Sequence, residues 1–117
     1  ENLSTDPSDS TMGIAHAARL AWELGCNVVK VPWTGSEDSF RLVSSAVPIP
    51  VLVSGGPKNE PFSTLLEMVE SSIIAGGSGV CIGRHVFGTE DPVSHVRALR
   101  AIVHDGATAS EACRYLE

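Results

Sequence analysis

The sequence is poor in positive charge. Only 8 of its 117 residues are Lys or Arg, against 14 Asp and Glu, which gives a formal net charge of −6. Such a surface repels the phosphate backbone of nucleic acids and anionic lipid head groups over much of its area. We therefore expect neither nucleic acid nor a membrane as a partner, although local donors can still hold a phosphorylated small molecule.

Long apolar runs and paired cysteines are also missing. No window approaches the roughly 18 apolar residues of a membrane span, and no secretory signal is expected at Glu1. Cys26, Cys81 and Cys113 form no metal-binding pair, and an odd number is typical of reduced thiols in a cytoplasm. We expect a soluble, cytoplasmic protein without metal or other cofactor, with Cys81 as a small core residue.

The sequence does contain an alternation of helix-like and strand-like segments, with composition ordinary for a soluble α/β protein. After an expected loop at residues 1–10, helical spacing of apolar residues and cap motifs predict helices at 12–24, 37–46, 61–75, 92–104 and 108–116. Short β-branched runs predict strands at 27–32, 51–54 and 79–82. Asp91 is expected to cap the fourth helix, and Thr108 has Glu111 at capping-box spacing.

Strands without strict polar alternation, each followed by a helix, favour a parallel sheet covered by helices. No linker divides the chain, so residues 1–117 are treated as one domain. Three strands do not close a barrel. The pattern is compatible with a small open sheet, or with the last three units of a larger barrel.

Lys30 is the most informative residue, because lysine is rarely buried inside a strand. Alternation places Val29 and Val31 on one face of the sheet and Lys30 on the other. One interpretation is that the ammonium group reaches water at the end of the strand. The other is that loss of surrounding water leaves a neutral amine, which can attack a carbonyl group and form an imine.

Two strand ends carry glycine. Gly55 and Gly56 follow one strand, and Gly83 with Arg84 follows the next. Glycine lets backbone amides approach an anion, and a guanidinium group can make paired hydrogen bonds to phosphate. Each motif alone also fits an ordinary turn or a surface ion pair, but the last two strand ends of (β/α)₈ barrels commonly form a phosphate site.

Other polar and aromatic residues near the strand ends are weaker candidates. Trp33 and Ser54 could line a pocket, and His85 could contact a substrate, but Ser54 has no partners at a recognisable triad spacing. The remaining histidines lie on expected helices without a metal-ligand arrangement.

Four motifs together resemble the class I fructose-bisphosphate aldolases of archaeal type. The wider group is the DeoC/LacD aldolase family, which includes aminodideoxyheptulosonate synthases. The motifs are VVKVPWTG at 28–35, SFR at 39–41, SGGPK at 54–58 and IGRHVF at 82–87.

The resemblance implies the C-terminal three β/α units, strands 6 to 8, of a (β/α)₈ TIM barrel. It implies that Lys30 is the Schiff-base lysine, and that Gly55, Gly56, Gly83 and Arg84 bind the phosphate of the substrate. The activity implied is cleavage or formation of a carbon–carbon bond in fructose bisphosphate or a related ketose phosphate, as in glycolysis and gluconeogenesis. Full-length aldolases of this type are commonly homo-oligomers.

The family's proton-donating tyrosine and its acidic substrate contacts should precede Glu1, so we expect a fragment that is inactive alone. The alternative is a non-catalytic phosphometabolite-binding or assembly module that retains the phosphate loops. An upstream strand that carries the tyrosine would favour the enzyme.

Overall fold

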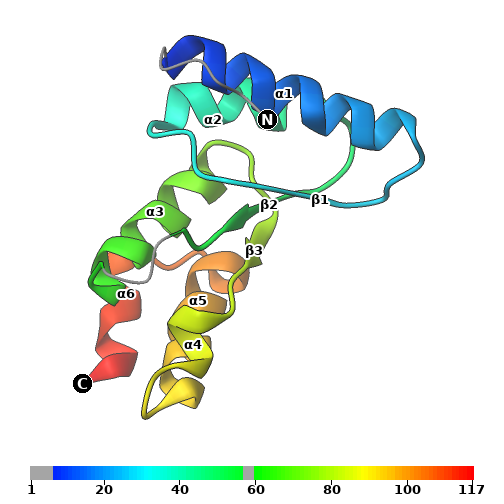
Figure 1. Ribbon diagram of the computed structural model, residues 1–117. Coiled ribbons are helices and arrows are strands. Elements are labelled where there is room, and N and C mark those ends of the chain that lie inside the picture. Colours follow the sequence, from blue (N-terminus) through cyan, green and yellow to red (C-terminus); the bar gives the residue numbers. More distant parts are fainter. Residues whose placement is uncertain (1–6, 57–59) are drawn as a thin grey trace.

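Three short parallel strands form the centre of the protein, and helices follow each of them (Figure 1). The computed structural model describes residues 7–56 and 60–117. The elements are α1 Pro7–Glu23, β1 Val29–Val31, α2 Glu37–Ser44, β2 Val51–Ser54, α3 Phe62–Ile74, β3 Gly79–Cys81, α4 Arg84–Phe87, α5 Pro92–Asp105, α6 Ala109–Ala112 and the 3₁₀ helix η1 Cys113–Leu116.

The sheet has the order β1-β2-β3 with both pairs parallel, which confirms the predicted parallel sheet. Lys30 lies opposite Leu52, and Leu52 lies opposite Gly79. Because side chains alternate along a strand, this register places Lys30, Leu52, Ser54 and Cys81 on one face. Within the described residues β1 and β3 are the edges of the sheet, each with one side unpaired.

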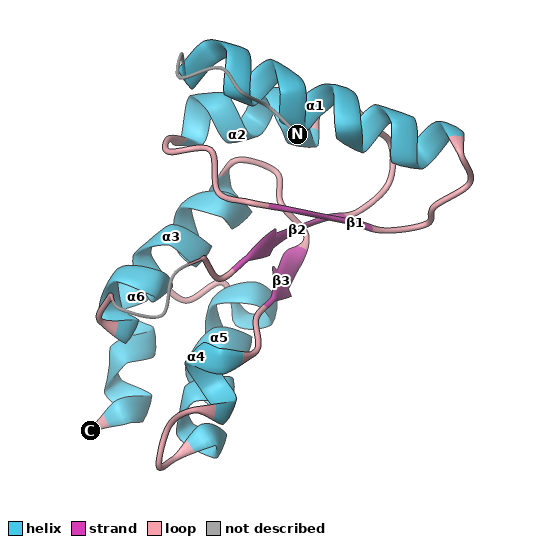
Figure 2. Ribbon diagram, in the orientation of Figure 1, coloured by secondary structure: helices cyan, strands magenta, loops and turns pink. Residues whose placement is uncertain are grey.

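The valine face of the sheet forms the first core. Val31, Val51 and Val53 are buried there in one cluster with Phe40 and Val43 of α2 and with alanines of α1. Figure 2 shows α1 and α2 lying together on one side of the sheet. Burial of β-branched side chains on this face fixes which way each strand faces, since a slip of one residue would turn Lys30 into the core.

The opposite face is largely uncovered, and one prediction about it is wrong. Cys81 was expected in the core, but its side chain is exposed. The reason is the register: Cys81 pairs with Ser54 and shares the face of Lys30, which is itself exposed. A cysteine in a short apolar strand is therefore buried or exposed according to which face the helices cover.

A second core joins the later helices. Leu66 and Val69 of α3 pack with Ala98 and Ile102 of α5 and with Ala112 of α6. Asp91 caps α5 by accepting a hydrogen bond from the backbone N–H of Ser94, and the capping box of Thr108 and Glu111 is present. Both predicted caps are confirmed.

Helix boundaries differ from the expectation at several points. The first helix begins at Pro7 and not near Met12. Proline fits the first turn of a helix. The sequence pattern missed this start because the polar residues around Pro7 show no apolar period. The expected loop at residues 1–10 is therefore wrong for 7–10, which are helical, and its residues 1–6 lie outside the described residues. Helix α4 was not predicted, since four residues are too few to show a helical period. No helix in the described ranges is long and apolar enough to cross a membrane.

Candidate active site

The carboxyl ends of the three strands lie at one edge of the sheet, because the strands are parallel and consecutive. Trp33 follows β1, Gly55 follows β2 and Gly83 follows β3. In α/β proteins this edge is where ligands bind, since the loops that leave it converge there. Lys30 is in the middle of β1, one residue before the strand ends.

Lys30 points away from the valine core. Its neighbour Val31 is buried, whereas the Lys30 side chain is exposed. The amine is therefore open to the uncovered face of the sheet within the described part of the chain. Any enclosure of this amine requires further structure over that face.

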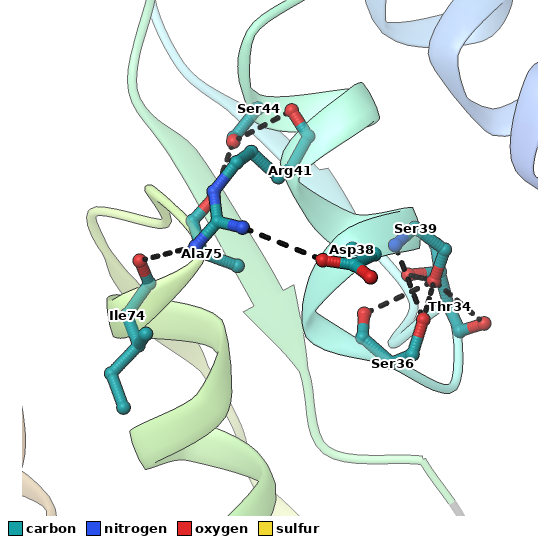
Figure 3. A network of polar contacts seen from close by, with 8 residues as sticks. All are labelled: Thr34, Ser36, Asp38, Ser39, Arg41, Ser44, Ile74 and Ala75. Carbon is teal, nitrogen blue, oxygen red and sulfur yellow. Dashed lines mark hydrogen bonds and ion pairs between the residues drawn. The ribbon is translucent and has the colours of Figure 1, made fainter.

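The loop after Lys30 is ordered by a network of hydroxyl groups (Figure 3). The Ser39 hydroxyl donates to Thr34 Oγ1 at 2.7 Å, and the Ser36 hydroxyl accepts from the Ser39 backbone N–H at 3.1 Å. Ser36 thereby caps α2, whose first turn carries the acidic residues Glu37 and Asp38. This cap fixes where the chain turns from β1 into α2.

A second set of contacts in Figure 3 attaches α2 to the end of α3. The Ser44 hydroxyl donates to the Ala75 carbonyl at 2.7 Å, and an Arg41 guanidinium nitrogen donates to the Ile74 carbonyl at 3.3 Å. Arg41 also pairs with Asp38 at 3.6 Å. These bonds satisfy carbonyl groups that a helix end leaves without partners. They also hold the helix that follows β1, the strand of Lys30, against the end of α3.

A hollow of about 430 Å³ opens at the carboxyl edge of the sheet. Its lining includes five residues that the sequence analysis named: Trp33, Ser54, Gly55, Gly56 and His85. Trp33 is held in place against Phe40, with ring centroids 5.3 Å apart. The structure therefore brings the ends of β1 and β2 and the start of α4 to one concave surface.

Gly83 and Arg84 are not part of that lining. Both are exposed, and α4 begins at Arg84. Pro57 and Lys58 of the SGGPK motif at 54–58 lie outside the described residues. Lys30 is likewise absent from the lining, so the hollow and the lysine are separate features of the same edge.

His85, just after β3, lies against the loop that follows β2. A Cβ atom added to Gly55 would lie 2.8 Å from His85 Nδ1 and 3.1 Å from its Cε1. The imidazole of α4 therefore lies directly against the glycine that follows β2. Gly56 has a positive φ of 69°, a conformation that glycine adopts at little cost.

Sequence reasoning did not single out the other five lining residues, which are Pro32, Glu60, Thr64, Leu65 and Met68. Thr64 and Met68 are four residues apart on α3, a spacing that places both on one helix face. The sequence shows this spacing, but no local pattern indicates that this face of α3 borders the loops after the strands. No group of three or more His, Cys, Asp or Glu in the ranges 7–56 and 60–117 is arranged to hold a metal ion.

Comparison with known protein families gives one match that covers most of the chain. The model of the DeoC/LacD family aldolases matches residues 4–89.

Curated relatives agree with the family match. An uncharacterized aldolase of Saccharolobus solfataricus is 34% identical over 89% of this chain and 38% of its own length. A 2-amino-4,5-dihydroxy-6-oxo-7-(phosphonooxy)heptanoate synthase of Streptomyces griseus is 35% identical over 92% of this chain and 39% of its own length. The chain thus spans about two fifths of the length of these relatives.

Solved structures show the same relationship in three dimensions. An archaeal fructose 1,6-bisphosphate aldolase superposes with a TM-score of 0.79 and 34% identity, over 90% of this chain and 42% of that one. Another archaeal fructose-1,6-bisphosphate aldolase, with its catalytic lysine bound covalently to the carbinolamine intermediate, gives a TM-score of 0.77 and 33% identity over 87% and 41%. The parallel sheet and its helices are similar to part of these aldolases, and the chain belongs to the DeoC/LacD aldolase family.

Proposed function

We propose that this chain carries the nucleophile and the phosphate site of a Schiff-base-forming aldolase that acts on a phosphorylated keto sugar. The observation that carries the proposal is Lys30, on the uncovered face of a parallel sheet whose carboxyl edge also carries the glycine loops. A similar archaeal aldolase has its catalytic lysine bound covalently to a carbinolamine.

In this proposal β1, β2 and β3 are strands 6, 7 and 8 of a (β/α)₈ barrel. The loops after the last two strands of such barrels commonly bind phosphate. Gly55, Gly56, Gly83 and Arg84 follow β2 and β3, and are therefore assigned to the phosphate of the substrate. Ser54 and Trp33 line the hollow beside them.

The chemistry begins when the Lys30 amine attacks the ketone carbon and forms a carbinolamine. Loss of water gives an iminium ion, which accepts the electron pair of the carbon–carbon bond as that bond breaks. The products are an aldehyde and an enamine; protonation of the enamine and hydrolysis then release the second product and the free lysine. The phosphate contacts hold the ketone at the amine and contribute binding energy away from the reacting bond.

Two features must be supplied from outside the described residues. Lys30 is exposed, so the uncovered face needs the other strands of the barrel. A proton donor is also needed, and Tyr115, the single tyrosine, is on η1, in a separate hollow with Ala101 and Asp105. We expect the preceding strands of the barrel to cover this face and to carry the proton donor.

The substrate proposed is fructose 1,6-bisphosphate or a related ketose phosphate. Two similar structures are fructose-1,6-bisphosphate aldolases, and one relative is named for a product with a keto group and a phosphonooxy group. These names share a phosphorylated carbon skeleton with a carbonyl group. The shared chemistry fits a chain that carries both a reactive lysine and a phosphate site.

Reductive trapping tests the proposal. The full-length protein is mixed with dihydroxyacetone phosphate and borohydride, and the adduct is located by mass spectrometry. We expect one reduced adduct at Lys30, its loss in Lys30→Met, and little or no adduct in residues 1–117 alone. A folded protein that binds the phosphate but forms no adduct would refute the aldolase mechanism and favour a non-catalytic binding module.

A further inference from the structure

His85 differs from the other three histidines of the chain. His16 and His104 are exposed and His95 is half-buried, whereas His85 keeps only 8% of its surface accessible. A histidine side chain is seldom buried unless it has polar partners. His85 lies on α4, a helix of four residues, where it borders the hollow and lies against Gly55.

The ring of His85 spans the gap between two loops. It extends from α4, just after β3, to Gly55, just after β2, where its Nδ1 would lie 2.8 Å from an added Cβ. Gly55 is not among the glycines with positive φ. Lack of a side chain at residue 55 is therefore explained by the space that the imidazole occupies, and the two residues form one contact.

The hollow beside this contact contains few groups that can bind an anion. His85 lines it together with the hydroxyl-bearing Ser54 and Thr64, and Glu60, which carries a carboxylate, also lines it. A carboxylate repels phosphate, so the site needs a donor that can carry positive charge. Among the described lining residues, His85 is the only side chain that can carry one. Arg84, which the proposed function assigns to the same phosphate, is exposed and lies outside this lining, so within the hollow itself the side-chain donor is His85.

We propose that His85 recognises the phosphate group of the substrate from within the hollow, and makes the site selective for phosphorylated over unphosphorylated carbonyl compounds. This proposal rests on the proposed aldolase function and adds a specificity-determining side chain to it. Gly55 and Gly56 supply backbone N–H groups, and His85 supplies a side-chain donor from the neighbouring loop. The substrate phosphate thus joins the ends of β2 and β3 through one imidazole ring.

Paired substrates separate this role from a structural one. Borohydride trapping at Lys30 is measured against the concentration of dihydroxyacetone phosphate and of unphosphorylated dihydroxyacetone. In His85→Ala we expect the half-saturating concentration to rise about tenfold or more for the phosphate ester, the loss expected for one charge-assisted hydrogen bond. The value for dihydroxyacetone should change less than about twofold, since that compound has no phosphate group.

Two further variants complete the design. His85→Asn keeps a side-chain N–H donor, and it should recover part of the affinity for the phosphate ester. His16→Ala removes an exposed histidine from α1 and should leave both half-saturating concentrations unchanged. An equal loss for the two substrates in His85→Ala would assign His85 a purely structural role, and no loss for either would also overturn the proposal.

A direct titration keeps this proposal separate from the aldolase mechanism. Inorganic phosphate is added to the folded protein while the ring protons of His85 are followed by NMR. A saturable shift at His85, weaker or absent at His16, supports phosphate recognition even if Lys30 forms no adduct. A protein that forms the Lys30 adduct but shows no phosphate-dependent change at His85 keeps its proposed function and loses this assignment.

Discussion

At the scale of single residues, two adjacent glycines serve different purposes. Gly56 has a φ of 69°, where any side chain is strained. Gly55 has no such requirement, but a Cβ there would lie 2.8 Å from His85 Nδ1 and 3.3 Å from Ile82 Cγ1. The sequence shows only a Gly-Gly pair, and the structure distinguishes a conformational glycine from a steric one.

Replacement of Gly55 by alanine should therefore act through His85. We expect Gly55→Ala to lower the free energy of unfolding by about 1–3 kcal/mol, the usual cost of overpacking. Addition of His85→Ala should restore part of that loss, because it removes the atom that the new methyl group meets. Denaturant unfolding of the single and double variants measures both effects.

Gly83→Ala is the matched control for this experiment. Gly83 has a φ of −118°, and a Cβ there meets nothing within 4 Å. Its alanine variant should unfold at nearly the same denaturant concentration as the unchanged protein. An equal loss in Gly83→Ala and Gly55→Ala would contradict the steric explanation.

At the scale of elements, α5 depends on the cap at its first turn. Asp91 accepts from the Ser94 backbone N–H at 3.2 Å and from the Ser94 hydroxyl at 2.6 Å. The hydrogen bonds from the Ser94 side chain and backbone hold the pKa of Asp91 below its ordinary value of 3.8. The carboxylate is thus more favourable in the folded chain than in the unfolded chain.

This shift predicts a pH dependence of stability. Because the folded pKa is lowered, the contribution is fully present above pH 3.8 and is lost as the pH falls through the folded pKa. Asp91→Asn keeps a capping side chain that does not titrate. We expect the unchanged protein to have the higher Tm at pH 7 and to lose that advantage at about pH 2.

The neighbouring Glu90→Gln variant controls for the loss of one negative charge next to the cap. Its Tm difference from the unchanged protein should vary less between the two pH values than that of Asp91→Asn. If the two variants respond to acid alike, the effect is due to net charge and not to the cap.

At the scale of the whole molecule, the helices leave much of one face of the sheet uncovered. Lys30 and Cys81 are exposed on that face, and an apolar hollow of about 640 Å³ lies between β3 and α5. Unpaired strand edges and open apolar surface are typical sites of further pairing. A barrel that places β1 to β3 as its last three strands would enclose this face.

The accessibility of Cys81 tests that enclosure. In residues 1–117 alone, we expect Cys81 and Cys26 to react with a thiol reagent at similar rates, since both are exposed. In the full-length protein Cys81 should be slowed about tenfold or more, because a covered thiol reacts slowly. Cys26, in the connection from α1 to β1, is the internal control. Equal rates in both forms would rule out a closed barrel over this face.

Sequence pattern predicted the regular elements well where the physical signal was local. Alternation in Val29, Lys30 and Val31 gave the face of each side chain, and the caps at Asp91 and Thr108 gave two helix starts. Pattern failed at Cys81, at α4 and at the start of α1. The burial of Cys81 depends on which face of the sheet the helices cover. Helix α4 is too short to show a helical period, and the polar residues at the start of α1 show no apolar period.

By itself, the sequence determined the parallel β/α order, the family resemblance and the position of Lys30 and the glycines at strand ends, because these follow from local periodicity and turn chemistry. Only the tertiary structure decided that His85 meets Gly55, that Arg84 lies outside the hollow, and that Thr64 and Met68 border it. Those relations join residues from separate loops and helices. Their distances are set by how the helices pack on the sheet, which no local pattern specifies.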